Sequence, residues 1–282
     1  MSELKFNNLS TGLDLLNAQF LVKAADLVYE DLNQIQTIIA QSLSLVNYKS
    51  FDIRDTQAFL AANNEIIVLA FRGTTSINDW RTDFRVKLIP VISGLVHRGF
   101  NEALDYIWKD LKQAILNFKD KEQSIWITGH SLGGALATLV ADRLTNDSME
   151  VKGVYTFGQP RVGNKVFANN YDGKMKEYTF RFVHDEDMVA KIPSFLQGYN
   201  HIGTECYFDR EGTLYTDKIR LRKFISRCTS VAMRSSENAS ELSAQNPGGI
   251  RDHGLGYYER CIRENYIKEK GGPETFQEYI NS

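Results

Sequence analysis

Residues 124–134 of this chain read SIWITGHSLGG, and this stretch decides the fold. A short apolar run predicts a strand over 124–128, and apolar residues at helical spacing follow Ser131. The run between them fits G-x-S-x-G, the pattern of a nucleophile elbow, in which a serine lies on a sharp turn between a strand and a helix. The flanking glycines leave room for such a turn. We therefore predict that Ser131 is a nucleophile at the carboxyl edge of a sheet.

Strand-like and helix-like segments alternate on both sides of this stretch. Apolar residues at helical spacing predict helices in the first forty or so residues and over 100–118, and two strand-like runs flank the turn signal Asn63-Asn64. Further strands are predicted over 151–157 and 178–183. This alternation predicts an α/β fold with a central, mostly parallel sheet and flanking helices. With no repeat or linker in the sequence, we expect one domain over residues 1–282.

Composition restricts the classes of function. The chain has 282 residues, 43% of them hydrophobic, and a net charge of −2, which indicates a globular protein and gives no reason to expect nucleic acid. Cys206, Cys228 and Cys261 have neither the number nor the spacing of a disulfide framework or a zinc site. No P-loop or dinucleotide motif is present, so no cofactor and no metal are expected.

The sequence also suggests a location. Its first residues lack the apolar core of a signal peptide, and no apolar run approaches the length of a transmembrane segment. As written, the chain is expected to be soluble and cytoplasmic. Export by a leaderless route, or after removal of a signal, stays open. The oligomeric state is not predicted.

A nucleophilic serine needs a histidine base and a carboxylate that orients the histidine. In α/β-hydrolases these follow in the order serine, acid, histidine, which leaves His201 and His253. His201 precedes a strand-like run and is expected to be structural. His253 lies in a polar loop before a final helix and is the predicted base. The acid stays open at this stage, because three acidic residues, 185–187, follow one strand.

Several motifs together resemble one family. FRGT at 71–74, GHSLGGA at 129–135 and TFGQPRVG at 156–163 are similar to segments of the class 3 lipases. That family is typified by fungal triacylglycerol lipases and includes feruloyl esterases and plant phospholipases. The resemblance extends over about residues 15–260. It implies an α/β-hydrolase fold and the hydrolysis of carboxylic esters through an acyl-enzyme.

The resemblance also suggests roles for individual residues. The family pattern Asp-x-Val-x-x-Leu/Ile-Pro matches residues 187–193, which favours Asp187 as the acid, with Asp185 as the second choice. Asp252 adjoins His253 too closely in sequence to reach its ring. The expected oxyanion donors are the backbone N–H of Leu132 and the residue after Arg-Gly, Thr74.

Class 3 lipases place a lid after this oxyanion segment, here near residues 76–88. Apolar residues at i, i+3, i+7 and i+11 would share one face of a helix over an acyl-binding groove: Ile77, Trp80, Phe84 and Leu88. The alternative is that this stripe packs permanently on the core.

Three functions follow from these observations. The first is hydrolysis of lipid esters, as a triacylglycerol lipase or phospholipase acting on lipid, including at a lipid–water interface. The second is hydrolysis of soluble short-chain or feruloyl-type esters. The third is a non-catalytic binding protein with the α/β-hydrolase fold, which is disfavoured because the chain has a candidate for every catalytic role.

Overall fold

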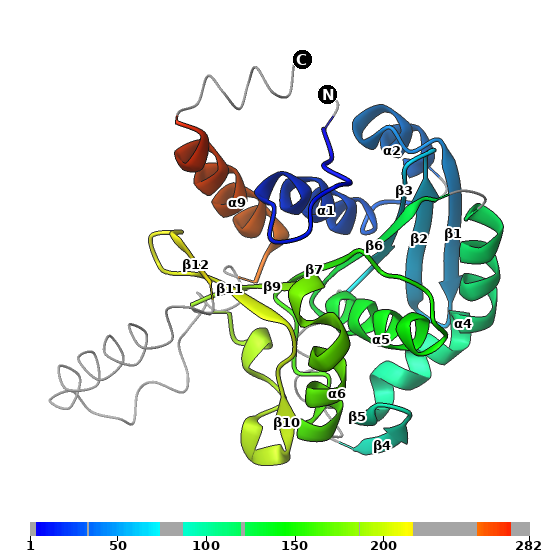
Figure 1. Ribbon diagram of the computed structural model, residues 1–282, viewed down its shortest axis with the longest axis vertical. Helices are drawn as coiled ribbons and strands as arrows, with labels where there is room; N and C mark the ends of the chain where they lie inside the picture. Colours follow the sequence, from blue (N-terminus) through cyan, green and yellow to red (C-terminus); the bar gives the residue numbers. More distant parts are fainter. Residues whose placement is uncertain are drawn as a thin grey trace, which may run out of the picture.

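A single twisted sheet forms the centre of the molecule (Figure 1). The computed structural model describes residues 4–32, 34–73, 87–119, 122–185, 187–216 and 253–271. In this part of the chain the sheet has eight strands in the order β1-β2-β3-β6-β7-β9-β11-β12. The strands from β3 through β6, β7 and β9 to β11 run parallel, and the remaining pairs are antiparallel. The predicted mostly parallel sheet is therefore confirmed.

The strands of this sheet are β1 (Asn47–Ile53), β2 (Thr56–Ala62), β3 (Ile66–Phe71), β6 (Ser124–His130), β7 (Gly153–Phe157), β9 (Thr179–His184), β11 (Thr204–Phe208) and β12 (Leu214–Thr216). A second, four-stranded sheet consists of β4 (Leu88–Val91), β5 (Gly94–His97), β8 (Gly163–Asn164) and β10 (Tyr199–Asn200). The α-helices are α1 (Leu15–Leu27), α2 (Ile35–Leu43), α4 (Arg98–Phe118), α5 (Leu132–Asn146), α6 (Lys165–Met175) and α9 (Leu255–Lys270). Short 3-10 helices are η1 (Lys176–Tyr178), η2 (Val189–Lys191) and η3 (Phe195–Gln197).

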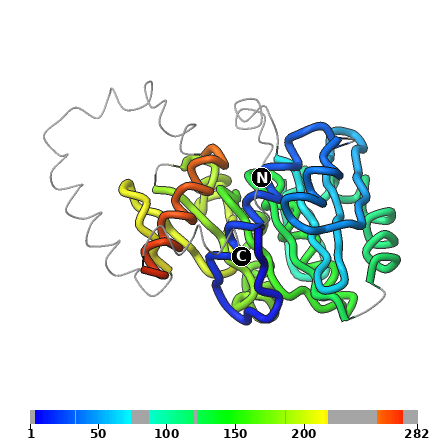
Figure 2. The backbone as a smooth tube through the Cα atoms, turned by 90° about the horizontal axis from the view of Figure 1, so that it is seen from above, coloured from blue at the N-terminus to red at the C-terminus, as the bar shows by residue number. Residues whose placement is uncertain are grey.

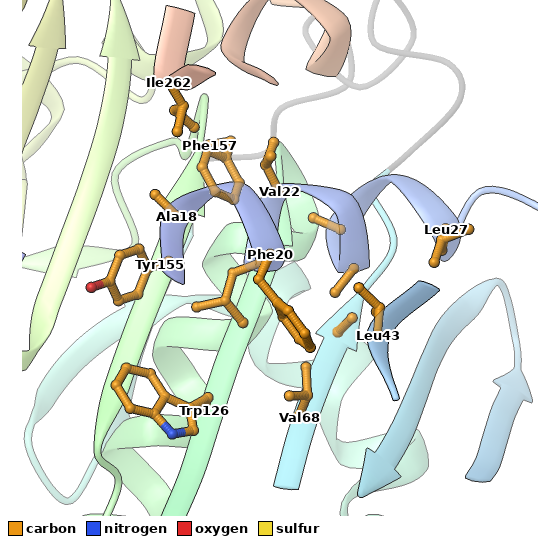
Figure 3. Close-up of a cluster of buried hydrophobic side chains, with 14 of the residues drawn as sticks. Ala18, Phe20, Val22, Leu27, Leu43, Val68, Trp126, Tyr155, Phe157 and Ile262 are labelled. Atoms are coloured by element: carbon orange, nitrogen blue, oxygen red, sulfur yellow. The ribbon is translucent and has the colours of Figure 1, made fainter. Parts of the chain in front are cut away.

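Helices cover the sheet on both faces, and each face has its own core. On one face, α1, α2 and α9 bury side chains such as Phe20, Leu43 and Ile262 against Trp126 and Tyr155 of the sheet (Figure 3). The amino-terminal helix α1 and the carboxyl-terminal helix α9 pack against each other here (Figure 2). On the other face, α5 packs on β3, β6 and β7, and α4 packs on β1 and β2, while α6 packs on β5 and β8 of the second sheet. Burial of both faces explains why β3 is apolar throughout.

The sequence predictions and the structure differ at the sheet edges. The strand β1 was not predicted, because most of its residues are exposed or half-buried at the edge and carry little apolar signal. Predicted segments in the sheet interior and the long amphipathic helix α4 agree with the structure. No helix in the described residues is long and apolar enough to cross a membrane.

Candidate active site

Four neighbouring parallel strands end where the candidate site lies. β3 is followed by Arg72-Gly73, β6 by Ser131, β7 by Gly158 and β9 by Asp185. Carboxyl ends of parallel strands lie at one edge of a sheet, which is where α/β proteins bind ligands. The loops that carry the predicted catalytic residues therefore converge at this edge.

Ser131 has the strained backbone of a nucleophile elbow. Its φ of 56° and ψ of −128° lie in a region that non-glycine residues rarely adopt, at a cost of about 1–3 kcal/mol. The turn depends on the flanking glycines: a Cβ at Gly129 would lie 2.3 Å from the Gly133 carbonyl oxygen, and one at Gly133 would lie 2.2 Å from that of Phe71. The Ser131 N–H donates to the Phe157 carbonyl at 2.9 Å, so the adjacent strand fixes the turn.

Asp187 and His253 form a hydrogen-bonded pair, although 66 positions separate them in sequence. His253 Nδ1 lies 2.9 Å from Asp187 Oδ2, and both side chains are almost fully buried. The same carboxylate oxygen accepts a hydrogen bond from the Tyr258 hydroxyl at 2.6 Å. The other oxygen, Oδ1, accepts from the Val189 N–H at 2.8 Å and the Ala190 N–H at 3.4 Å. The carboxylate thus has four donors, which offset the cost of its burial.

This arrangement determines the tautomer of His253. An ionised carboxylate only accepts hydrogen bonds, so His253 Nδ1 carries the proton and Nε2 presents a lone pair. Nε2 and the Ser131 hydroxyl are both buried, and neither has a hydrogen-bond partner in the described part of the chain. The structure therefore joins Asp187 to His253 but forms no Ser131–His253 hydrogen bond. In serine hydrolases without substrate this bond is often long and tightens when substrate binds.

Only some of the other predicted site residues lie in the part of the chain that the structure describes. Leu132 begins α5, so its N–H belongs to the first turn of the helix that follows the nucleophile. Thr74, Asp252 and the predicted lid residues Ile77, Trp80 and Phe84 lie outside the described residues. Leu88 does not continue a helix: it is the first residue of β4, opposite His97 of β5. The prediction that the helical stripe reaches Leu88 is therefore wrong, because pairing with β5 overrides the helical spacing.

The alternatives considered for the acid and the base lie elsewhere. The Asp185 carboxylate accepts from the Tyr207 hydroxyl at 2.5 Å and lies 3.4 Å from the Arg210 guanidinium. These two groups, together with Lys191, lower the pKa of Asp185. His201 precedes the first residue of β11, whereas Asp187 follows the last residue of the parallel neighbour β9, so the two lie at opposite edges of the sheet.

The motif at 156–163 has two structural roles that the sequence did not reveal. Gly158 has a φ of 59°, and a Cβ there would lie 2.7 Å from both Asp187 Oδ2 and His253 Nδ1. Arg161 holds the loop after Asp187: its Nη1 donates to the Pro193 carbonyl at 2.9 Å and also to that of Lys191. The motif thus makes room for the pair of Asp187 and His253 and fixes the loop that carries the acid.

Tyr258 and His130 are further residues of the site that the sequence did not assign to it. Tyr258 follows His253 by about one helical turn, and burial beside Asp187 raises the pKa of its hydroxyl well above the usual value. Its O–H therefore stays a donor to the carboxylate. His130 is buried beside Ser131, and burial lowers the pKa of its imidazole to about 3, so it remains neutral. Both residues are recognised as part of the site only from their hydrogen bonds in the folded structure.

In the part of the chain that the structure describes, neither a metal cluster nor the groove beside α5 belongs to this site. Within the described ranges, no group of three or more His, Cys, Asp and Glu side chains could hold a metal ion. A groove of about 330 Å³, lined by Trp108, Asp142 and Arg143 among others, lies near the carboxyl end of α5. At 1.5 Å per helical residue, this is roughly 20 Å from Ser131 at the other end of the helix.

The sequence is similar to those of known lipases. Residues 68–197 match the family model described as Lipase (class 3). The secreted mono- and diacylglycerol lipase 1 of Fusarium solani is 35% identical over 159 residues, which cover 54% of this chain and 47% of that protein. The lipase of Rhizomucor miehei is 34% identical over 176 residues, or 58% of this chain and 48% of that protein. The chain spans about half the length of these curated relatives.

Solved structures show the same fold. The mono- and diacylglycerol lipase of Aspergillus oryzae is similar with a TM-score of 0.63 and 26% identity, covering 72% of this chain and 86% of that one. A triacylglycerol lipase whose catalytic centre is formed by a serine protease triad has a TM-score of 0.58 and 26% identity, covering 68% and 80%.

Proposed function

Because this chain belongs to the class 3 lipase family, we propose that it hydrolyses carboxylic esters of lipids through an acyl-enzyme at Ser131. The observation that carries the proposal is the conjunction of a strained serine at the strand–helix junction with a buried histidine–carboxylate pair. Strain and burial of this kind persist where a function requires them. A binding protein that had lost catalysis would not need all three groups.

The proposed reaction has two steps. The Ser131 hydroxyl attacks the ester carbonyl while its proton passes to His253 Nε2, and the resulting imidazolium is stabilised by Asp187. The backbone N–H of Leu132 and the Thr74 segment donate to the oxyanion. His253 then protonates the departing alcohol. In the second step a water molecule attacks the acyl-enzyme, and its proton returns through His253 to Ser131.

Covalent labelling tests this proposal. A fluorophosphonate probe should modify the protein, and mass spectrometry of the digested product should place the adduct on Ser131. The variant Ser131→Ala should not be labelled. An adduct on another residue, or an unlabelled wild-type protein that is folded by circular dichroism, would contradict the proposal.

A lipid substrate is supported by an apolar projection on the loop that follows the proposed acid. In the loop that follows Asp187, Phe195 and Leu196 are 67% and 93% exposed. They belong to η3, whose ends are fixed by a capping box between Ser194 and Gln197, while Arg161 holds the preceding residues. Two adjacent large apolar side chains held out in water by an ordered loop are typical of a surface that contacts lipid.

We expect this projection and the proposed lid to matter only for aggregated substrate. The double variant Phe195→Ser/Leu196→Ser, and separately Trp80→Asp, should lower turnover of emulsified lipid about tenfold while leaving a soluble short-chain ester within twofold. The measurement is kcat/KM on both substrates, with Ile92→Ser as the control, since Ile92 is 87% exposed in the hairpin between β4 and β5. Equal losses on both substrates would favour the soluble-ester alternative. A lowered Tm of Trp80→Asp would indicate that Trp80 packs in the core.

Two broader expectations remain proposals. We propose that residues 1–282 form one catalytic domain, which limited proteolysis would test by the absence of a smaller stable active fragment. The relatives from Fusarium solani and Penicillium cyclopium are named as secreted lipases. Export of this chain is proposed from that similarity, and fractionation of the source culture would test it.

A further inference from the structure

The ring of His130 lies between Tyr29 and His253. Its Nδ1 is 2.9 Å from the Tyr29 hydroxyl, and its Nε2 is 2.6 Å from the backbone carbonyl oxygen of His253. The centroids of the two imidazole rings are 4.4 Å apart, with 35° between their planes. Tyr29 follows α1, whereas His130 ends β6, so helix and sheet packing fixes both ends of this contact.

The direction of each hydrogen bond follows from the groups involved. A carbonyl oxygen only accepts, so His130 Nε2 must carry the proton and donate to His253. The neutral ring then has an unprotonated Nδ1, which accepts from the Tyr29 hydroxyl. The Tyr29 oxygen in turn accepts from the Gly73 N–H at 3.1 Å. One ordered chain therefore runs from Gly73 through Tyr29 and His130 to the His253 backbone.

This chain connects three loops of the proposed site. Gly73 immediately precedes the predicted oxyanion residue Thr74, and a Cβ at Gly73 would lie only 3.0 Å from the Ser131 Cβ. His130 is the residue before the nucleophile. Its other partner, His253, is the predicted base, whose own side chain is hydrogen-bonded to Asp187. Asp187 sets the tautomer of His253, whereas the contact with His130 constrains its backbone and the plane of its ring.

The proximity of the two rings has an electrostatic consequence as well. His253 gains a positive charge when it accepts the serine proton. A neutral aromatic ring against its face attracts that charge, whereas a second imidazolium would repel it. The ordered hydrogen bonds keep His130 in one neutral tautomer with its face toward His253.

We propose that Tyr29 and His130 are positioning residues for catalysis, forming a brace that aligns the base with the nucleophile and the oxyanion loop; this rests on the proposed function. The inference concerns alignment, because neither side chain hydrogen-bonds to the predicted reacting atoms, Ser131 Oγ and His253 Nε2. Removal of the brace should therefore affect the chemical step more than substrate binding.

The first test is Tyr29→Phe, which deletes one hydroxyl and leaves the ring. It should lower kcat about tenfold with KM within twofold, since the alignment lost is that of two hydrogen bonds, one donated to His130 Nδ1 and one accepted from the Gly73 N–H. The matched control is Tyr48→Phe, because the Tyr48 hydroxyl likewise donates one bond, to the Leu32 carbonyl at 2.7 Å, but lies outside the site. It should leave kcat unchanged. Both variants are assayed well below their measured Tm.

Two replacements of His130 distinguish the effect of its hydrogen bonds from the effect of its ring. His130→Phe keeps a ring and removes both bonds, whereas His130→Gln keeps a donor that can reach the His253 carbonyl. We expect kcat to fall about a hundredfold in the first and less in the second. In the double variant Tyr29→Phe/His130→Phe, the loss should be smaller than the product of the single losses, because both act through the same contact.

An activity-independent readout distinguishes failure of the brace from failure of the proposed function. In protein labelled with ¹⁵N-histidine, the His130 Nε2–H should be protected from exchange, and Tyr29→Phe should speed its exchange. Unchanged exchange, or multiplicative losses in kcat, would overturn the brace even in an active enzyme. Protected exchange in a protein that fluorophosphonate does not label would instead overturn only the proposed function.

Discussion

Replacing Asp187 with asparagine is expected to lower kcat about 10⁴-fold in a protein that still folds. The carboxylate oxygen Oδ2 faces two donors, His253 Nδ1 and the Tyr258 hydroxyl. Oδ1 faces two backbone N–H groups, so the amide of an asparagine must direct its own N–H₂ toward a donor in either orientation. With the amide nitrogen at the Oδ2 position, His253 is expected to switch tautomer, so that Nε2 carries the proton and no longer accepts one from Ser131.

The matched control for this variant is Asp185→Asn. Asp185 lies two residues away on the same loop, but its contacts are with Tyr207 and Arg210. We expect its kcat to stay within about threefold of wild type, with a small decrease in Tm. The measurement is kcat for a soluble ester, together with the melting temperature of both variants. A large loss in Asp185→Asn with activity retained in Asp187→Asn would reverse the assignment of the acid.

The sequence alone was sufficient to predict the helices and strands whose hydrophobic pattern reflects burial. Strand β3 and residues 125–127 of β6 are apolar because helices cover both faces of the sheet. Helix α4 is amphipathic because one side contacts the sheet and the other faces water. Ser131 could be predicted because its turn requires glycines at fixed spacing. The acid could not be selected from spacing alone, since three acidic residues follow one strand, and the choice of Asp187 rested on a family pattern.

The remaining features depend on contacts between distant segments. The contact of Tyr29 with His130 spans 101 positions, and that of His130 with the His253 backbone spans 123. Neither leaves a local pattern, since a tyrosine after a helix and a histidine after a strand are ordinary in such places. Leu88 shows the opposite case: its helical spacing was a local signal, but pairing with β5 determines its structure.

Gly158 is the position where a single carbon atom would separate the acid from the base. A Cβ there would lie 2.7 Å from Asp187 Oδ2, 2.7 Å from His253 Nδ1 and 2.8 Å from His253 Cε1. These distances are too short for van der Waals contact, and both neighbours are buried, so they cannot move into solvent. The backbone at Gly158 is also held, because its N–H donates to the Phe182 carbonyl at 3.0 Å.

Gly158→Ala is therefore expected to lower kcat about 10²- to 10³-fold, because displacing the base by about 1 Å from the nucleophile costs roughly a hundredfold. The variant also carries a backbone cost of about 1–2 kcal/mol, since φ is 59°. Gly198→Ala is the control that separates the two effects: its φ of 84° imposes a similar backbone cost, yet a Cβ there would meet nothing within 4 Å. Both variants should lose stability in urea unfolding, Gly158→Ala by more because its Cβ also meets buried atoms, but only Gly158→Ala should lose kcat on a soluble ester. If their kcat values fall equally, the loss reflects backbone strain, and Gly158 does not act by leaving space for the pair of Asp187 and His253.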